Sequence, residues 1–281
     1  MRVVMDDAGD VPVEAVEKYR LTILPVNVMF GTEEFLSGVD ITHETFYEKV
    51  KEVGDHNFPK TSQPTPFQFA EAYRSLLAEG EKEILTITVS EKLSGTYASA
   101  EAAGKELEKE GTFYLFDSQG GSAAQGFMAI EAAKMAEAGQ DIDAILTRLE
   151  AMRETMVITF LINSLEYAVK GGRVSALRST MASLLNIKPI MHLKDGLIVE
   201  AGKVRTYKKA MSYMIDLVKE RVGDQPVRLA FLHARDLEGM RTLQAMARPQ
   251  LNIIEEIEVD LAIAVAINLG PGALGIAAIP A

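Results

Sequence analysis

The feature that most constrains the fold is an apolar run, a hydroxyl-bearing turn and a helical segment in immediate succession. Residues 84–89 are apolar and rich in β-branched side chains, which is typical of a buried strand. Residues 97–110 are rich in Ala, Glu and Lys, which favour a helix. Between them lies the sequence Leu-Ser-Gly-Thr-Tyr at 93–97. The pattern predicts a strand, a turn and a helix, which is the repeating unit of α/β folds.

Two interpretations of this turn are open. The first turn of a helix carries unpaired backbone N–H groups and the positive end of the helix dipole, so it favours small anions. Ser94 and Thr96 would add hydroxyl donors, and Gly95 would allow close approach of the backbone. Alternatively, Ser94 or Thr96 only caps the helix, as these residue types often do. The turn by itself is compatible with both interpretations.

The same pattern recurs through the first half of the chain. Residues 2–5 and 112–116 read as strands, followed by polar loops that begin at Asp6 and Asp117. Alternating strands and helices predict a parallel sheet covered on both faces, with ligands beyond the carboxyl ends of its strands. We therefore expect three polar loops, which follow the predicted strands at 2–5, 84–89 and 112–116, to converge. Asp10, before Val-Pro, is expected to cap a helix.

A proline-rich segment at 59–66 contains two kinds of signal. Residues 65–68, Thr-Pro-Phe-Gln, have the form of a capping box with proline at the first helical position. Thr61 and Ser62 are not explained by this helix start. They are either part of a solvated turn or hydroxyls that face a ligand from a proline-stiffened loop.

The pattern changes near residue 156, and we expect two domains, 1–155 and 156–281. A strand at 156–162 precedes a short helix that ends at two glycines before Arg173, which is either a surface arginine or a guanidinium aimed at a carboxylate or phosphate. A hairpin with an Asp-Gly turn at 195–196 makes the second sheet mixed. Asn268 is expected to end an apolar strand at 261–267, where its amide either donates to an anion or caps the next turn.

Composition excludes several classes of protein. The formal charge of −11 argues against nucleic acid as a partner, and the absence of Cys removes thiolate metal sites and cysteine nucleophiles. The four histidines show no spacing typical of a metal site, and no phosphate-binding, dinucleotide-binding or hydrolase motif occurs. We expect no metal, no cofactor and no membrane span, with at most transient membrane contact, and a cytoplasmic location.

Eight short blocks, in order and spacing, resemble the DegV family from end to end. They are Asp6/Asp10-Val11-Pro12, Lys60-Thr61-Ser62-Gln63-Pro64, Leu93-Ser94-Gly95-Thr96-Tyr97, Asp117-Ser118, Lys170-Gly171-Gly172-Arg173, Ile187-Lys188-Pro189-Ile190, Lys208-Lys209-Ala210 and Gly270-Pro271-Gly272-Ala273. The resemblance implies an N-terminal three-layer α/β/α domain with a mainly parallel sheet, a C-terminal α/β domain with a mixed sheet, and a ligand cleft between them. It implies a carrier, not an enzyme, that holds a long-chain fatty acid for a separate ATP-dependent fatty acid kinase subunit.

The resemblance also assigns residues. It implies that the fatty-acid carboxylate is held by Thr61, Ser62, Ser94, Gly95, Arg173 and Asn268, with Thr96 and Ser118 as further candidate contacts. The family usually has His at position 268 and Ser at position 7, where this chain has Asn268 and Asp7. The acyl tunnel would be lined by residues such as Phe127, Met128, Phe160, Ile162, Leu184 and Ile267.

Two alternatives use the same site. The chain could be an enzyme on a small carboxylated or phosphorylated substrate, with Asp7, Asp117 or His233 as a general base near Ser94. It could also be a regulatory protein whose ligand site is no longer used. A purified protein that retains a lipid would favour the carrier.

Overall fold

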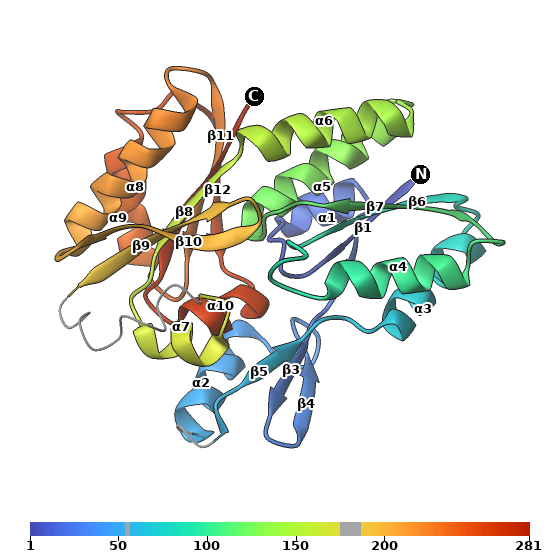
Figure 1. The fold of residues 1–281 in the computed structure, drawn as a ribbon, viewed down its shortest axis with the longest axis horizontal. Coiled ribbons are helices and arrows are strands. Elements are labelled where there is room, and N and C mark those ends of the chain that lie inside the picture. Colours follow the sequence, from blue (N-terminus) through green and yellow to red (C-terminus); the bar gives the residue numbers. More distant parts are fainter. Residues whose placement is uncertain (54–56, 175–186) are drawn as a thin grey trace. The chain divides into compact units, whose positions relative to one another are not determined.

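The computed structural model describes residues 1–53, 57–174 and 187–281 (Figure 1). The chain divides into two compact units. The first comprises Met1–Arg153 with Ala262–Ala264, and the second comprises Glu154–Leu261 with Val265–Ala281. After the chain has left the first unit, it therefore returns to it once, for a short segment near the C-terminus.

The first unit is built on a parallel four-stranded sheet in the order β2-β1-β6-β7. Its strands are β1 (Arg2–Asp6), β2 (Thr22–Leu24), β6 (Glu83–Thr88) and β7 (Thr112–Asp117). All three neighbouring pairs are parallel, which confirms the predicted parallel sheet. The carboxyl ends of β1, β6 and β7 therefore lie at one edge.

Helices cover both faces of this sheet, so the unit has the predicted three layers. The helices are α1 (Val13–Lys18), α3 (Pro66–Ala78), α4 (Thr96–Glu106), α5 (Ser122–Glu137) and α6 (Ile142–Thr155). In Figure 1, α3 and α4 lie on one side of the sheet and α5 and α6 on the other. Phe69, Tyr73 and Ala103 of α3 and α4 form a buried cluster with Val4 and Ile84 of the sheet. The face of α3 that carries Phe69 and Tyr73 thus follows the helical period.

A small antiparallel sheet, in the order β4-β3-β5, belongs to the same unit. It consists of β3 (Asn27–Phe30), β4 (Glu33–Leu36) and β5 (Lys60–Ser62), and α2 (His43–Val53) follows β4. Of the two interpretations of Thr61 and Ser62, the solvated turn was wrong, because these residues pair with Val28 and Asn27 in the sheet. Their pairing is with a strand more than thirty residues away, so the local proline-rich sequence does not reveal it.

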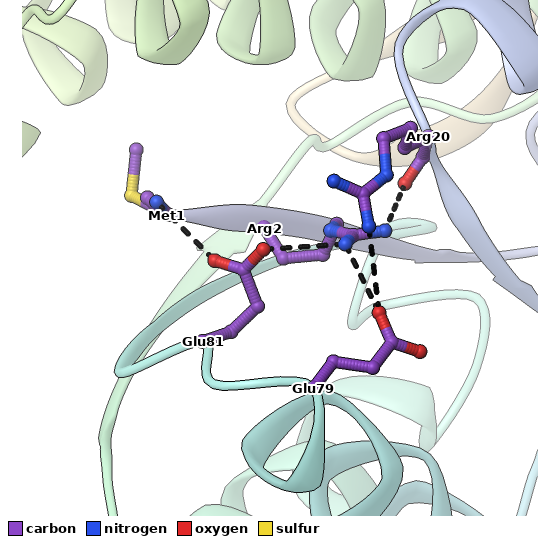
Figure 2. A network of polar contacts seen from close by, with 5 residues as sticks. All are labelled: Met1, Arg2, Arg20, Glu79 and Glu81. Carbon is purple, nitrogen blue, oxygen red and sulfur yellow. Dashed lines mark hydrogen bonds and ion pairs between the residues drawn. The ribbon is translucent and has the colours of Figure 1, made fainter.

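A cluster of charged groups lies where β1 begins (Figure 2). Arg2, only 8% exposed, places Nη2 3.1 Å from Oε2 of Glu79 and 3.2 Å from Oε1 of Glu81. The amino group of Met1 lies 3.6 Å from Glu81, and the guanidinium of Arg20 lies 3.6 Å from Glu79. Arg2 also donates to the carbonyl of Arg20 at 3.1 Å. The buried guanidinium therefore has two carboxylate partners, as burial of a charge requires.

The second unit is built on a six-stranded sheet in the order β10-β9-β8-β13-β11-β12. Only β11 and β12 are parallel, and the other neighbours are antiparallel, which confirms the predicted mixed sheet. The strands are β8 (Val157–Leu161), β9 (Lys188–Lys194), β10 (Leu197–Val204), β11 (Val227–His233), β12 (Ile253–Asp260) and β13 (Leu274–Pro280). Asp195 and Gly196 both have positive φ, as the predicted Asp-Gly hairpin turn requires.

The helices of the second unit include one, α10 (Ile263–Leu269), that we predicted to be a strand. The first two residues of α10 belong to the first unit. The other helices are α7 (Leu165–Gly171), α8 (Tyr207–Val222) and α9 (Leu237–Ala247). The strand predicted at 261–267 was wrong, because this apolar run forms α10 and Asn268 lies in its last turn. A short apolar run without clear periodicity fits a buried strand and a buried helix equally. The sequence also predicts a helix at 175–185, from its small residues and leucines, and this segment lies outside the described residues.

Candidate functional site

The turn between β6 and α4 brings its hydroxyl groups together. Ser94 Oγ lies 2.8 Å from Thr96 Oγ1, and the backbone N–H of Ser94 donates to the carbonyl of Ser90 at 3.1 Å. The N-cap of α4 is Gly95, and no side chain forms a capping hydrogen bond there. The capping interpretation of Ser94 and Thr96 was therefore wrong. The first turn of α4 carries backbone donors with two hydroxyls beside them, which is the geometry that an anion favours.

The strand that carries Thr61 and Ser62 lies close to this turn. A Cβ atom built on Gly95 would lie only 2.7 Å from Nε2 of Gln63, the residue after Ser62. A side chain at position 95 would therefore meet the end of the Gln63 side chain, which would have to shift. Within the first unit, the structure thus brings together the neighbourhoods of four predicted site residues, Thr61, Ser62, Ser94 and Gly95.

The three loops expected at the carboxyl edge of the parallel sheet do converge. Asp6 accepts from the N–H of Val89 at 2.9 Å, which joins the loop after β1 to the end of β6. The N–H of Ser90 donates to the carbonyl of Gly120 at 2.9 Å, which joins the loops after β6 and β7. The N–H of Ser122 donates to the carbonyl of Ala8 at 2.6 Å and closes the triangle.

Ser118 and Asp117 take part in holding these loops. Ser118 is fully buried, and its Oγ accepts from the N–H of Gly120 at 3.0 Å. Asp117 accepts from the N–H groups of Glu91 and Gln119 at 3.2 and 3.0 Å. The structure therefore gives both side chains partners in the loops themselves.

Two carboxyl groups at the end of β1, the buried Asp6 and the half-buried Asp7, accept hydrogen bonds from backbone amides. Asp6 is fully buried and accepts from the N–H of Ala8 and the side chain of Gln125, both at 3.1 Å, in addition to Val89. Burial raises its pKa despite these donors. Burial also raises the pKa of Asp7 to about 7, and the hydrogen bond from Ser37 and that from the N–H of Val26, at 2.9 Å, oppose this shift.

Asp10 does not cap α1, and that prediction was wrong. The N-cap of α1 is Pro12, without a side-chain cap. Asp10 instead accepts from Ser122 Oγ at 2.5 Å and from the N–H of Ala262 at 2.8 Å. Asp10 therefore binds the segment by which the chain returns to the first unit, a contact between residues 252 positions apart.

The two predicted site residues of the second unit lie close to each other. Gly172 ends α7 with φ of 78°, and the exposed Arg173 donates through Nη1 to the carbonyl of Gly171 at 2.8 Å. A Cβ atom built on Gly171 would lie 2.5 Å from Oδ1 of Asn268, which is 8% exposed. The glycine pair thus ends the helix, as predicted, and allows α10 to pack against the chain beside Arg173.

Among the residues that the structure describes, none of the contacts of Asp7, Asp117 and His233, the candidate general bases, is with Ser94. Ser94 Oγ has Thr96 as its hydrogen-bond partner in the described chain, while Asp7 and Asp117 accept from backbone amides. His233 places Nδ1 3.5 Å from Oδ1 of Asp260. The residues that the structure describes also contain no group of three side chains able to hold a metal ion.

The candidate tunnel residues are buried wherever they are described, with 5% exposure or less for Phe127, Met128, Phe160, Ile162 and Ile267. Leu184 lies outside the described residues. Among the described helices, none has the length and the apolar character needed to span a bilayer.

Sequence reasoning missed Asn27, a buried amide that contacts Ser62. Asn27 is 4% exposed, and its Nδ2 donates to Ser62 Oγ at 3.3 Å. The sequence did contain a signal that could have identified it, a single Asn within the apolar run 21–30. A polar side chain in a buried strand needs hydrogen-bond partners, so such a residue points to a buried polar contact.

Comparison with known proteins identifies the family. The model of the DegV family matches residues 1–281. The chain belongs to the DegV family. Protein DegV of Bacillus subtilis is 32% identical to it over 278 residues, covering 98% of this chain and 97% of that protein.

Two similar proteins of known structure are described as binding fatty acids. A DegV family protein from Thermus thermophilus, described as binding fatty acid, matches with a TM-score of 0.92 and 31% identity, over 100% of this chain and 99% of that one. A stearic-acid-binding protein from Eubacterium ventriosum matches with a TM-score of 0.87 and 26% identity, over 100% and 98%. The DegV fold is therefore shared along the whole chain.

Proposed function

We propose that this DegV protein binds a long-chain fatty acid and holds its carboxylate with Thr61, Ser62, Ser94, Gly95, Arg173 and Asn268. The observation that carries the proposal is the closeness of the Gln63 side chain, next to Ser62 at the end of β5, to Gly95 at the uncapped start of α4. Relatives that span the whole chain and are described as fatty-acid binding support the choice of ligand.

The chemistry of these groups suits an ionised carboxylate. Hydroxyls, backbone N–H groups and a guanidinium are all donors, and an ionised carboxylate only accepts. Asp7 accepts from Val26 and Ser37, so its carboxyl group is engaged within the fold. A chain of about 15 methylenes contributes roughly 12 kcal/mol of gross transfer free energy, before ordering costs, so the tail supplies most of the affinity.

We further propose that the chain is a carrier, organised as domains 1–155 and 156–281, that presents the bound acid to a separate ATP-dependent kinase. The resemblance to the DegV family supports this role. Mixing the loaded protein with a fatty acid kinase subunit and ATP should give acyl phosphate, and omitting either protein should give none. Product formation by this chain and ATP alone would favour the enzyme alternative.

The ligand is tested by mass spectrometry of the small molecules released when the purified protein is denatured. We expect a long-chain fatty acid in near-stoichiometric amount, or its uptake by delipidated protein. A protein that neither retains nor takes up fatty acid would overturn the proposal.

The role of Arg173 is tested by Arg173→Ala. We expect a roughly 10- to 100-fold loss of affinity for the acid with no change in fold, because a hydrogen bond to a charged group is lost. Arg241→Ala, which removes another exposed arginine of the second unit, is the matched control and should bind like the unmodified protein. Unchanged affinity of the Arg173 variant would remove this residue from the site.

A further inference from the structure

The side chain of Gln68 has an orientation fixed by the backbone. Its Oε1 accepts from the N–H of Thr65 at 2.8 Å, within the capping box that begins α3. A backbone N–H can only donate, so the oxygen of the Gln68 amide must face Thr65. The Nε2 of Gln68 must then face the other way, where it donates to Oδ1 of Asn27 at 3.2 Å.

The orientation of Asn27 follows from both of its sides. Oδ1 accepts from Gln68, and Nδ2 donates to the carbonyl of Gln63 at 3.3 Å. A backbone carbonyl only accepts, so this second contact independently places the nitrogen on the same side. Backbone groups at Thr65 and Gln63 thus fix the direction of every hydrogen bond in between.

This chain of hydrogen bonds ends at Ser62. The remaining proton of Asn27 Nδ2 is directed to Ser62 Oγ at 3.3 Å, so the hydroxyl accepts from Asn27. A hydroxyl has one proton, and a group that already donates cannot receive it. The proton of Ser62 is therefore available to a partner other than Asn27, and an anion is the partner that requires a donor.

We propose that Asn27 is a positioning residue for the ligand carboxylate. Gln68 orients the Asn27 amide, and Asn27 in turn leaves the Ser62 hydroxyl free to donate to the ligand. This inference rests on the proposed function, since Ser62 is one of the groups assigned to the carboxylate. Asn27 itself is 4% exposed and acts through Ser62.

The first test is a double-mutant cycle between Asn27→Ala and Ser62→Ala, read out as affinity of delipidated protein for stearate and for stearyl alcohol. We expect Asn27→Ala to weaken stearate binding roughly tenfold. In the Ser62→Ala background it should have no further effect, because the group it positions is gone. The alcohol can accept or donate, so its affinity should change much less.

Gln244→Ala is the matched control for loss of a buried amide. Gln244 is 3% exposed and donates to Glu258 at 3.0 Å in the second unit. We expect this variant to bind stearate normally. Losses that simply add in the double variant, or an equal loss for stearate and the alcohol, would overturn the positioning role.

Gln68→Glu tests the direction of the hydrogen bonds between Gln68, Asn27 and Ser62 without deleting a side chain. Glutamate also completes a capping box, so α3 should still begin at Thr65. Its second oxygen can only accept, so it faces Oδ1 of Asn27 with no proton between them unless the Asn27 amide turns over. Turning breaks the donation to the Gln63 carbonyl and offers an oxygen to Ser62, which then donates to Asn27 and is lost to the ligand. Without turning, Asn27 loses the hydrogen bond that orients it, so in both cases we expect stearate affinity to fall roughly tenfold.

The added charge of Gln68→Glu is separated from this effect by Gln68→Met, because Gln68 is half-buried and salt screens partly buried charges poorly. Gln68→Met removes the donor to Asn27 and adds no charge, and denaturant titration checks that it folds. We expect it to lose stearate affinity as well, and a folded Gln68→Met variant with normal affinity would overturn the inference. If the unmodified protein binds no fatty acid, both this inference and the proposed function fail. If it binds and these variants behave like it, only this inference fails.

Discussion

The two ends of β1 both bury an ionisable side chain, and the hydrogen-bond partners of these two side chains differ in kind. Arg2, at the start of the strand, is held by the carboxylates of Glu79 and Glu81 (Figure 2). Asp6, at the end of the strand, has N–H donors from Ala8, Val89 and Gln125.

Both ends therefore contribute to stability, but only the carboxyl end also arranges the loops of the candidate site. At the amino end, ion pairs join β1 to the segment before β6. At the carboxyl end, a carboxyl group gathers the backbone amides of loops that hold the candidate site. Loops at the carboxyl ends of parallel strands are where ligands bind, so they need a fixed arrangement of polar groups.

Replacing Asp6, at the carboxyl end of β1, should have the largest effect on the free energy of unfolding. Asp6→Ala leaves three buried donors without their acceptor, and we expect a loss of about 3–5 kcal/mol in the free energy of unfolding. Denaturant titration measures it. Asp40→Ala, which removes an exposed acceptor of the Leu36 N–H, is the control and should cost less than about 1 kcal/mol. An equally small loss at Asp6 would contradict the account.

The second prediction concerns the pH dependence of stability. The pKa of Asp7 is raised to about 7 in the folded chain, so folding favours its protonated form. This contribution is fully present below about pH 4 and is lost as the pH rises through about 7, by at most about 4 kcal/mol. Asp7→Asn should flatten the decline of unfolding free energy between these pH values. Asp6, whose pKa is also raised, should leave part of the slope.

Breaking the amino-end cluster should have a smaller effect. Arg2→Ala leaves Glu79 and Glu81 without their shared partner, but their side chains are 47% and 23% exposed, so water can replace it. We expect a loss of about 2 kcal/mol in unfolding free energy and no change in fatty-acid affinity. Reduced affinity in a folded variant would show that the two ends are not separable.

The smallest effect on stability should come from Ser94→Ala. Unlike Arg2→Ala, this variant should lose fatty-acid affinity and keep its stability. Ser94 Oγ contacts Thr96 and is not required as a helix cap, so the melting temperature should hardly change. Affinity for a fatty acid should fall about tenfold with the loss of one donor. A lower melting temperature with unchanged affinity would make Ser94 structural.

Features set by neighbouring residues could be predicted from the sequence. The capping box at Thr65–Gln68 and the Asp-Gly turn at 195–196 depend on a few adjacent side chains, and both were confirmed. The parallel and mixed sheets also followed from the order of strands and helices. Each of these signals is local or periodic along the chain.

Features set by distant partners could not be predicted. Thr61 and Ser62 are in a strand because Val28 and Asn27 pair with them, and Asp10 has its partners at Ser122 and Ala262. The helix at 263–269 replaces a predicted strand because its apolar residues fit either structure. For the site, the sequence named Ser62, but only the structure showed that hydrogen bonds link it through Asn27 to Gln68.

The central claim, that the site holds an ionised carboxylate, is tested most directly by NMR of delipidated protein loaded with stearic acid labelled with ¹³C at the carboxyl carbon. Donors around the carboxylate should keep the pKa of the bound acid below its ordinary value. We predict a single bound resonance, distinct from free acid, that does not titrate between pH 5 and 8. A bound resonance that titrates like the free acid, or the absence of a bound resonance, would contradict the account.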